Sequence, residues 1–234
     1  MGNFVICVKG ISGSGKSTRV YHLLKFFEKS GYTLSDFHFT NFEGKDKVIG
    51  VLIEELDLIF VGKIYKTGDI ERWQGYDVQT GAFGSASNFS EFLKENSSNY
   101  SFIIEGAGIT QTHRLRPKFL KQEIGFDTIM IQYYNYPVEG KQNYYDRIIY
   151  RSGEKPKKDV MWDKNLGFIK DCEFSNDDSK TVDCEVFDSN FDTPVYDFGV
   201  KFFKLVGALD FIEEFKKFVS KFDYIKQNKF ENFK

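Results

Sequence analysis

The sequence predicts an α/β fold in three layers, in which a parallel β-sheet lies between two layers of helices. The continuous apolar run from Phe4 to Val8 is typical of a strand buried on both faces of a parallel sheet. A glycine-rich segment follows at once. After it, Val20, Leu23, Leu24 and Phe27 have helical spacing, and Gly31 is a typical stop. A strand, a glycine loop and a helix in this order are the context that a phosphate-binding loop requires.

Residues 10–17 match the pattern G-x-x-x-x-G-K-[ST] at every fixed position. Glycines let successive backbone N–H groups point at phosphate oxygens, and the N-terminus of the next helix adds a favourable dipole. Lys16 is expected to neutralise charge on the transferred phosphoryl group, and the Ser17 hydroxyl is expected to ligate Mg²⁺. The motif therefore predicts a P-loop NTPase fold that binds ATP and Mg²⁺. The residues expected to hold the nucleotide are Gly10, Ser12, Gly13, Ser14, Gly15, Lys16, Ser17 and Thr18.

Length and composition indicate one domain that spans residues 1–234, because 41% of the residues are apolar and can supply a full core. The net charge of −2 gives no global electrostatic case for binding nucleic acid, although local basic clusters could bind it. Three cysteines that lie far apart predict neither a disulfide framework nor a zinc site. No signal sequence or bilayer-length apolar run is present, so we expect a cytoplasmic protein without membrane contact. The sequence does not indicate an oligomeric state.

Apolar runs and periodicities predict the remaining elements. The expected strands cover residues 4–8, 32–39, 58–61, 102–104, 128–132 and 184–187. The expected helices cover residues 16–30, 47–56, 89–95, 117–123 and 144–151, and a C-terminal amphipathic helix carries Phe211, Phe215 and Phe222. The α/β rhythm breaks at residues 42–84, which are rich in glycine. We interpret that segment as a substrate-specific insertion.

Three classes of P-loop protein compete for this chain: kinases, GTPase switches, and motor or AAA-type ATPases. The Asn-Lys-x-Asp segment with which switch GTPases identify guanine is missing. The chain also has little room for the sensor and arginine-finger segments of oligomeric ATPases. These observations favour a kinase, with a nucleotide-binding switch or regulatory ATPase as the alternative.

The loop sequence GISGSGKST resembles the loops of uridine and adenylylsulfate kinases, and the order of parts resembles the nucleoside and nucleotide kinase branch of P-loop proteins. The resemblance is strong over residues 4–30. It implies that a carboxylate at the end of the second or third strand faces the acceptor hydroxyl, and that arginines of a lid helix contact the phosphates. The corresponding positions in this chain are Asp36, Glu105, Arg147 and Arg151.

Asp36 and Glu105 are two candidates for the carboxylate that activates the acceptor. Asp36 closes the second expected strand, where a general base can reach a substrate hydroxyl, and its structural alternative is an Asp that caps a turn. Glu105 follows Ile103 and Ile104 like a Walker B acid, so it can hold the Mg²⁺ water shell or act as the base itself. The sequence leaves the choice between them open.

Arg147 and Arg151 lie four residues apart, so both project from one face of the expected helix. A planar guanidinium pairs two phosphate oxygens at once, which suits a lid over residues 147–165. The alternative is a solvated helix face with Asp146 as the partner.

Arg114, Arg116 and Trp73 are weaker candidates for substrate binding. The two arginines can hold an acceptor phosphate or a nucleic-acid backbone, although the start of a surface helix explains them equally well. Trp73 lies in the insertion beside Arg72 and Gln74, a mixture suited to stacking on a base, with core packing as its alternative.

Two motifs of other P-loop kinases are missing from this chain, which limits the kinase families that it can resemble. Glu105-Gly106-Ala107 stands where thymidylate kinases have Asp-Arg-Tyr, and the Asp-Gly-Asp-Asn run of adenylylsulfate kinases is absent. The chain resembles phage-encoded kinases in its P-loop, its unusual insertion and its Lys/Asn/Phe-rich composition. These kinases include those that phosphorylate 5-hydroxymethyluracil in DNA. This resemblance implies transfer of the γ-phosphate of ATP to a hydroxyl of a nucleoside, a nucleotide or a hydroxymethylated base in DNA.

Overall fold

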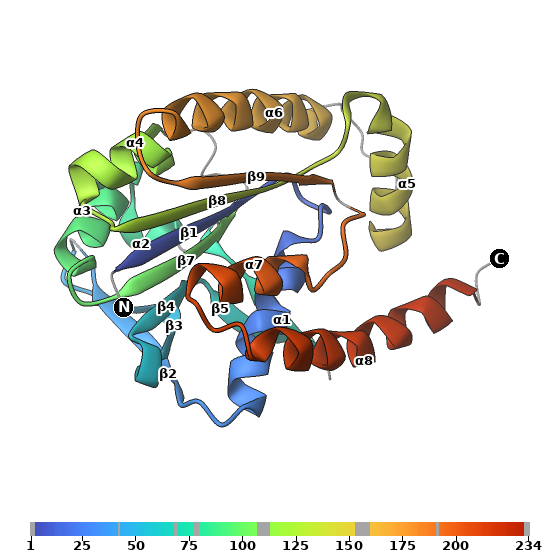
Figure 1. Cartoon of the computed structure of the whole chain (residues 1–234), viewed down its shortest axis with the longest axis horizontal. Helices are drawn as coiled ribbons and strands as arrows, with labels where there is room; N and C mark the ends of the chain where they lie inside the picture. The colour runs from blue at the N-terminus through green and yellow to red at the C-terminus, as the bar shows by residue number, and fades with distance from the viewer. Residues whose placement is uncertain are drawn as a thin grey trace.

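The computed structural model describes residues 3–41, 43–67, 70–76, 80–106, 113–152, 160–190 and 192–231. Within these ranges the side chains of residues 67, 70, 80, 147, 150–152, 160–161 and 223–231 are not described. The predicted α/β class is confirmed, because a mostly parallel sheet lies between two layers of helices (Figure 1).

In the described part of the chain, the central sheet has seven strands in the order β2-β3-β4-β7-β1-β8-β9. Their bounds are β1 Phe4–Lys9, β2 Leu34–Thr40, β3 Asp46–Ile53, β4 Leu58–Val61, β7 Ser101–Gly106, β8 Thr128–Asn135 and β9 Glu185–Asn190. The strands from β4 to β9 in this order pair in parallel, whereas β3 is antiparallel to both β2 and β4. A separate antiparallel hairpin consists of β5 (Lys63–Thr67) and β6 (Ile70–Gln74).

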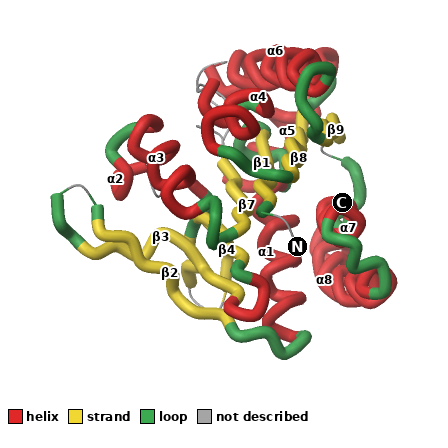
Figure 2. Tube along the Cα trace, turned by 60° about the vertical axis from the view of Figure 1, so that its left-hand side comes forward, coloured by secondary structure: helices red, strands yellow, loops and turns green. Residues whose placement is uncertain are grey.

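The helices cover both faces of the sheet. Their bounds are α1 Lys16–Lys29, α2 Thr80–Phe83, α3 Ala86–Asn96, α4 Pro117–Phe119, α5 Lys141–Ser152, α6 Val160–Ser179, α7 Asp197–Leu205 and α8 Phe211–Glu231. Shorter turns of helix are η1 Glu54–Leu56, η4 His113–Leu115, the π-helical η5 Leu120–Ile124, and η6 Val138–Gly140. Helices α1, α7 and α8 pack on one face, and α3, α4 and α6 pack on the other (Figures 1 and 2). None of the described helices is both long and apolar enough to cross a membrane.

The two cores explain why residues 4–8 of β1 are all apolar. Val5 and Cys7 point into the core beneath α3 and α6, while Ile6 and Val8 point into the core beneath α1 and α7. All four side chains are fully buried. A central parallel strand therefore loses the alternation of polar and apolar residues that a half-exposed strand shows.

The predicted helix over residues 47–56 is wrong, because these residues form β3 and the short turn η1. Val48, Ile49, Val51 and Ile53 are β-branched, which lowers helix propensity and favours a pleated strand. Pairing with β2 and β4 then fixes the segment in the sheet. Much of the glycine-rich segment 42–84 thus belongs to the main sheet, and β5 and β6 form its separate part.

Candidate active site

The glycine-rich loop runs from the carboxyl end of β1 to the first residue of α1. Gly10, Gly13 and Gly15 have φ angles of 146°, 90° and 84°, a region that side chains rarely enter. A Cβ at Gly10 would also lie 2.5 Å from the carbonyl oxygen of Tyr134, in the adjacent strand β8. The backbone conformation therefore favours glycine at positions 10 and 15, which the motif fixes, and also at position 13.

Lys16, Ser17 and Glu105 form one cluster at the carboxyl ends of β1 and β7. Lys16 Nζ lies 3.3 Å from Glu105 Oε1, and the Ser17 hydroxyl donates a hydrogen bond of 3.1 Å to Glu105 Oε2. Glu105 is 2% exposed and Lys16 is 6% exposed. The pairing of Val8 with Glu105 in the sheet brings the carboxylate beside the loop. The structure thus joins three of the predicted site residues.

The Lys16–Ser17–Glu105 cluster fits a phosphate and a magnesium ion. Carboxylate and hydroxyl oxygens are ligands that Mg²⁺ prefers, and a buried ammonium group beside them suits a phosphate. Lys16 and Ser17 also stand at the start of α1, where the helix dipole favours an anion. The donor set and the glycine geometry are consistent with Mg²⁺ and a nucleoside triphosphate.

Asp36 is not part of this cluster. It lies within β2, exposed and at the edge of the sheet, instead of at a strand end. The pairing register aligns Asp36 with Val51, Phe60 and Ile103 on successive strands. Three strand spacings of about 4.8 Å separate it from β7, or about 14 Å.

The arginines predicted for a lid lie on α5, four residues apart, and their side chains are outside the description. Within the same helix, Ile148 reaches the loop, because its Cδ1 is 3.1 Å from the position that a Cβ at Gly13 would take. The Tyr136 hydroxyl, just before α5, donates a hydrogen bond of 3.1 Å to the Gly13 carbonyl. Helix α5 therefore packs against the loop. Residues 153–159 of the expected lid lie outside the described residues, and residues 160–165 begin α6.

Arg116 takes part in a buried polar network. Asp171 on α6 accepts hydrogen bonds from Arg116 Nε at 3.1 Å, from Lys9 Nζ at 2.8 Å and from the Tyr133 hydroxyl at 2.7 Å. The guanidinium lies 4.5 Å from the centre of the Phe174 ring. Burial raises the pKa of the Tyr133 hydroxyl, which keeps it a donor to Asp171. Arg116 thus links α4 to the strand that leads into the loop.

Arg114 and Trp73 are placed differently from Arg116. Arg114 donates a hydrogen bond of 3.1 Å to the Ser90 hydroxyl on α3. Trp73 is 4% exposed and packs edge-on against Phe60, with 6.2 Å between ring centres. The ring of Trp73 is therefore a core side chain whose faces are covered.

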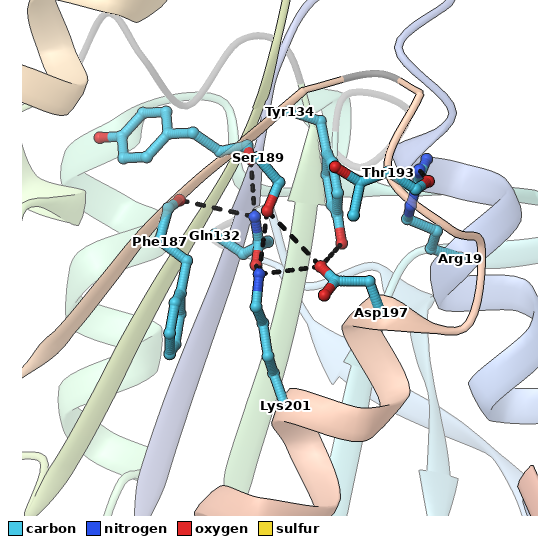
Figure 3. Close-up of polar contacts among 9 residues, drawn as sticks. Arg19, Gln132, Tyr134, Phe187, Ser189, Thr193, Asp197 and Lys201 are labelled. Atoms are coloured by element: carbon cyan, nitrogen blue, oxygen red, sulfur yellow. Dashed lines mark hydrogen bonds and ion pairs between the residues drawn. The ribbon is translucent and has the colours of Figure 1, made fainter. Parts of the chain in front are cut away.

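Arg19 is a loop-binding residue that the sequence analysis missed. Its Nη1 donates a hydrogen bond of 3.2 Å to the Ser14 carbonyl. Its Nη2 donates to the carbonyl of Thr193, which lies beside it in Figure 3. The guanidinium stacks on Tyr134 at 4.2 Å from the ring centre. Arg19 is 2% exposed. The sequence signal for this role was the position of Arg19, which lies one turn after the loop and beside the apolar stripe of α1.

A second polar group fixes the segment that Arg19 reaches. Lys201 of α7 donates hydrogen bonds to Gln132 at 2.8 Å, to Ser189 at 2.9 Å and to Asp197 at 2.8 Å (Figure 3). Its ammonium lies 4.5 Å from the centre of the Phe187 ring. These contacts tie α7 to β8 and β9, on either side of the connection that carries Thr193. Arg19 therefore joins the glycine loop to an anchored segment.

The cysteines are free thiols, and Cys7 and Cys172 are buried. Burial raises the pKa of each of these two to about 12, so both stay protonated near neutral pH. Neither thiol contributes a nucleophile to the site.

Comparison with known proteins adds the family. A profile of the family described as 5-hmdU DNA kinase 2 matches residues 1–193, which include the loop, Glu105 and α5. The chain belongs to the 5-hmdU DNA kinase 2 family. It is also 28% identical over 180 residues to the 5-hmdU DNA kinase 2 of Salmonella phage ViI. The similar region covers 73% of this chain and 56% of the phage protein, so the chain spans little more than half the length of that relative. The predicted resemblance to phage-type kinases of this family is confirmed.

Proposed function

We propose that the chain is an ATP-dependent kinase that transfers the γ-phosphate to the hydroxymethyl group of 5-hydroxymethyluracil in DNA. The observation that carries this proposal is the Lys16–Ser17–Glu105 cluster within a chain of the 5-hmdU DNA kinase 2 family. The family supplies the class of acceptor, and the cluster supplies groups suited to phosphoryl transfer.

Each residue of the cluster has a proposed task. Lys16 stabilises negative charge on the transferred phosphoryl group, while Ser17 and Glu105 hold Mg²⁺ through their oxygens. When bound, Mg²⁺ would neutralise charge on the β- and γ-phosphates. In the reaction a bond forms between the acceptor oxygen and phosphorus, the bond from phosphorus to ADP breaks, and the hydroxyl proton is released.

Glu105, rather than Asp36, is the carboxylate that we propose for this site. Glu105 touches both Lys16 and Ser17, whereas Asp36 is exposed on the edge strand β2, three strands away from β7. Arg147 and Arg151 are proposed to stabilise charge on the phosphates, because α5 packs on the loop through Ile148.

Label transfer tests the proposal directly. The protein is incubated with γ-labelled ATP, Mg²⁺ and one of four acceptors: nucleosides, nucleotides, plain DNA, or DNA of the same sequence that contains 5-hydroxymethyluracil. We expect label in the hydroxymethylated DNA alone, and no transfer with Lys16→Ala. Release of free phosphate without label in any acceptor would contradict the proposal and favour a regulatory ATPase.

A further inference from the structure

The β5–β6 hairpin has two faces of different character. Its register pairs Lys63 with Gln74, Ile64 with Trp73, and Tyr65 with Arg72. Directly opposed residues share a face and successive residues alternate between faces. Ile64 and Trp73 therefore lie on one face, and the other two pairs lie on the opposite face.

The first face is attached to the body of the protein. Trp73 is buried, and Ile64 packs against the core beneath α1. On the same face, Glu71 accepts hydrogen bonds from Lys25 and from the Tyr21 hydroxyl of α1, each at 3.1 Å. The orientation of the hairpin is thus fixed by both apolar and charged contacts.

The second face, which we call the outer face, carries Lys63, Tyr65, Arg72 and Gln74. Lys63 and Arg72 are exposed, and Tyr65 and Gln74 are half-buried. None of the four side chains forms a hydrogen bond or ion pair with another described residue. Glu71, the carboxylate among the described residues of the hairpin, lies on the attached face. The outer face therefore presents two cations, an aromatic ring and an amide.

The outer face starts next to the candidate active site. Gly75, which follows Gln74, packs so closely on Glu105 that a Cβ there would overlap its carbonyl and carboxylate oxygens. Gly62, which precedes Lys63, packs on Gln74 and Gly75 with a φ of 149°. The pair Lys63–Gln74 thus lies closest to Glu105, and Tyr65–Arg72 follows two residues farther along, at about 7 Å.

We propose that the outer face binds the DNA strand that carries the acceptor base, a proposal that rests on the proposed function. Lys63 and Arg72 pair with phosphates, and Tyr65 stacks on a base next to the acceptor. The charge of the face is complementary to a polyanion, although the whole chain has a net charge of −2. A strand held along the hairpin leads toward Glu105, where phosphoryl transfer is proposed.

Binding of a fluorescent DNA strand that contains 5-hydroxymethyluracil tests the outer face, measured by anisotropy across a salt series. For Lys63→Ala and Arg72→Ala we expect weaker binding and a salt slope that falls by about 0.7 for each lost phosphate contact. Tyr65→Ala should weaken binding about tenfold at constant salt slope. Lys63→Arg should keep most of the affinity, because the charge remains.

Lys66→Ala is the matched control. Lys66 is also an exposed lysine of β5, so its replacement by Ala removes the same charge. It lies on the attached face, however, with its Nζ 3.1 Å from Glu71 Oε1. Equal losses for Lys63→Ala and Lys66→Ala would overturn the proposal, since net charge alone would then explain both. Thermal melting of each variant shows whether the hairpin remains folded, and comparison with Lys63→Arg separates lost charge from lost structure.

Label transfer separates this proposal from the proposed function. If the wild-type protein labels hydroxymethylated DNA, the outer-face variants should raise the KM for DNA and leave the KM for ATP unchanged. An unchanged KM for DNA would overturn the role of the outer face and leave the kinase intact. If the wild-type protein binds DNA but transfers no label, the proposed kinase activity is contradicted. The anisotropy series alone then tests whether the outer face binds DNA. A wild-type protein that neither binds nor labels DNA overturns both.

Discussion

The Ser17 hydroxyl donates a hydrogen bond of 3.1 Å to Glu105 Oε2, although 88 residues separate the two in the sequence. The other carboxylate oxygen faces Lys16 Nζ at 3.3 Å. Both charged groups are almost fully buried. The two halves of the candidate site thus meet at one carboxylate, and this arrangement makes Glu105 the residue to test first.

Glu105→Gln should lower kcat by about 10²-fold or more, because the amide keeps the shape but loses the charge that faces Lys16 and the proposed Mg²⁺ site. If Glu105 holds the metal, the variant should also need more Mg²⁺ for half-maximal label transfer. Asp36→Asn is the matched control, and we expect near wild-type activity from it. A loss in Asp36→Asn with normal Mg²⁺ dependence would instead identify Asp36 as the base.

Gly75→Ala should disturb Glu105 although it replaces no charged residue. A Cβ at Gly75 would overlap Glu105, so either the carboxylate or the chain after β6 has to move. We expect a loss of at least about tenfold in kcat, because electrostatic stabilisation depends on the exact placement of charge. Gly81→Ala is the control, since a Cβ there meets no described atom within 4 Å. Similar activities of the two variants would contradict the role of the Gly75–Glu105 contact.

Local sequence signals predicted the part of the fold that carries the loop. The apolar run of β1, the glycine pattern and the stripe of α1 each lie within a short window, and the structure has all three elements. The prediction of a helix over residues 47–56 was wrong because pairing with β2 and β4 determines the secondary structure of this segment. These partner strands lie outside any short window of sequence. No pattern in the sequence showed that Asp36 would lie on an edge strand.

Helix α6 was missed for a different reason. Its inward positions include the polar residues Asn165, Asp171 and Ser175, which are all buried beside Phe168 and Cys172. A stripe of mixed polarity does not show the apolar period on which helix prediction depends. Asp171 pairs with Lys9, which directly follows the expected strand of residues 4–8. Such partners become visible only in three dimensions.

Arg19→Met should destabilise the fold and weaken ATP binding. It would leave the carbonyls of Ser14 and Thr193 without their charged donor, at a cost of about 3 kcal/mol in the free energy of unfolding. The freed loop should raise the KM for ATP more than it lowers kcat. Denaturant unfolding and label transfer measure the two effects. Tyr134→Phe is the control, because it keeps the ring under Arg19 and removes only a hydroxyl 3.5 Å from Asp197.

The contact between the hairpin and α1 should depend on pH through Glu71. Hydrogen bonds from Lys25, Lys66 and Tyr21 lower the pKa of Glu71 to about 2, compared with 4.5 for an ordinary glutamate. A carboxylate with a lowered pKa contributes stability above the unfolded value, and this contribution is lost as the pH falls from about 4.5 through about 2. Glu71→Gln should therefore be less stable than the wild-type protein at pH 7, and the difference should shrink over that range. Unfolding free energies of the two proteins measured between pH 7 and pH 2 check this, and a difference that stays constant would show that the ion pairs of Glu71 add no stability.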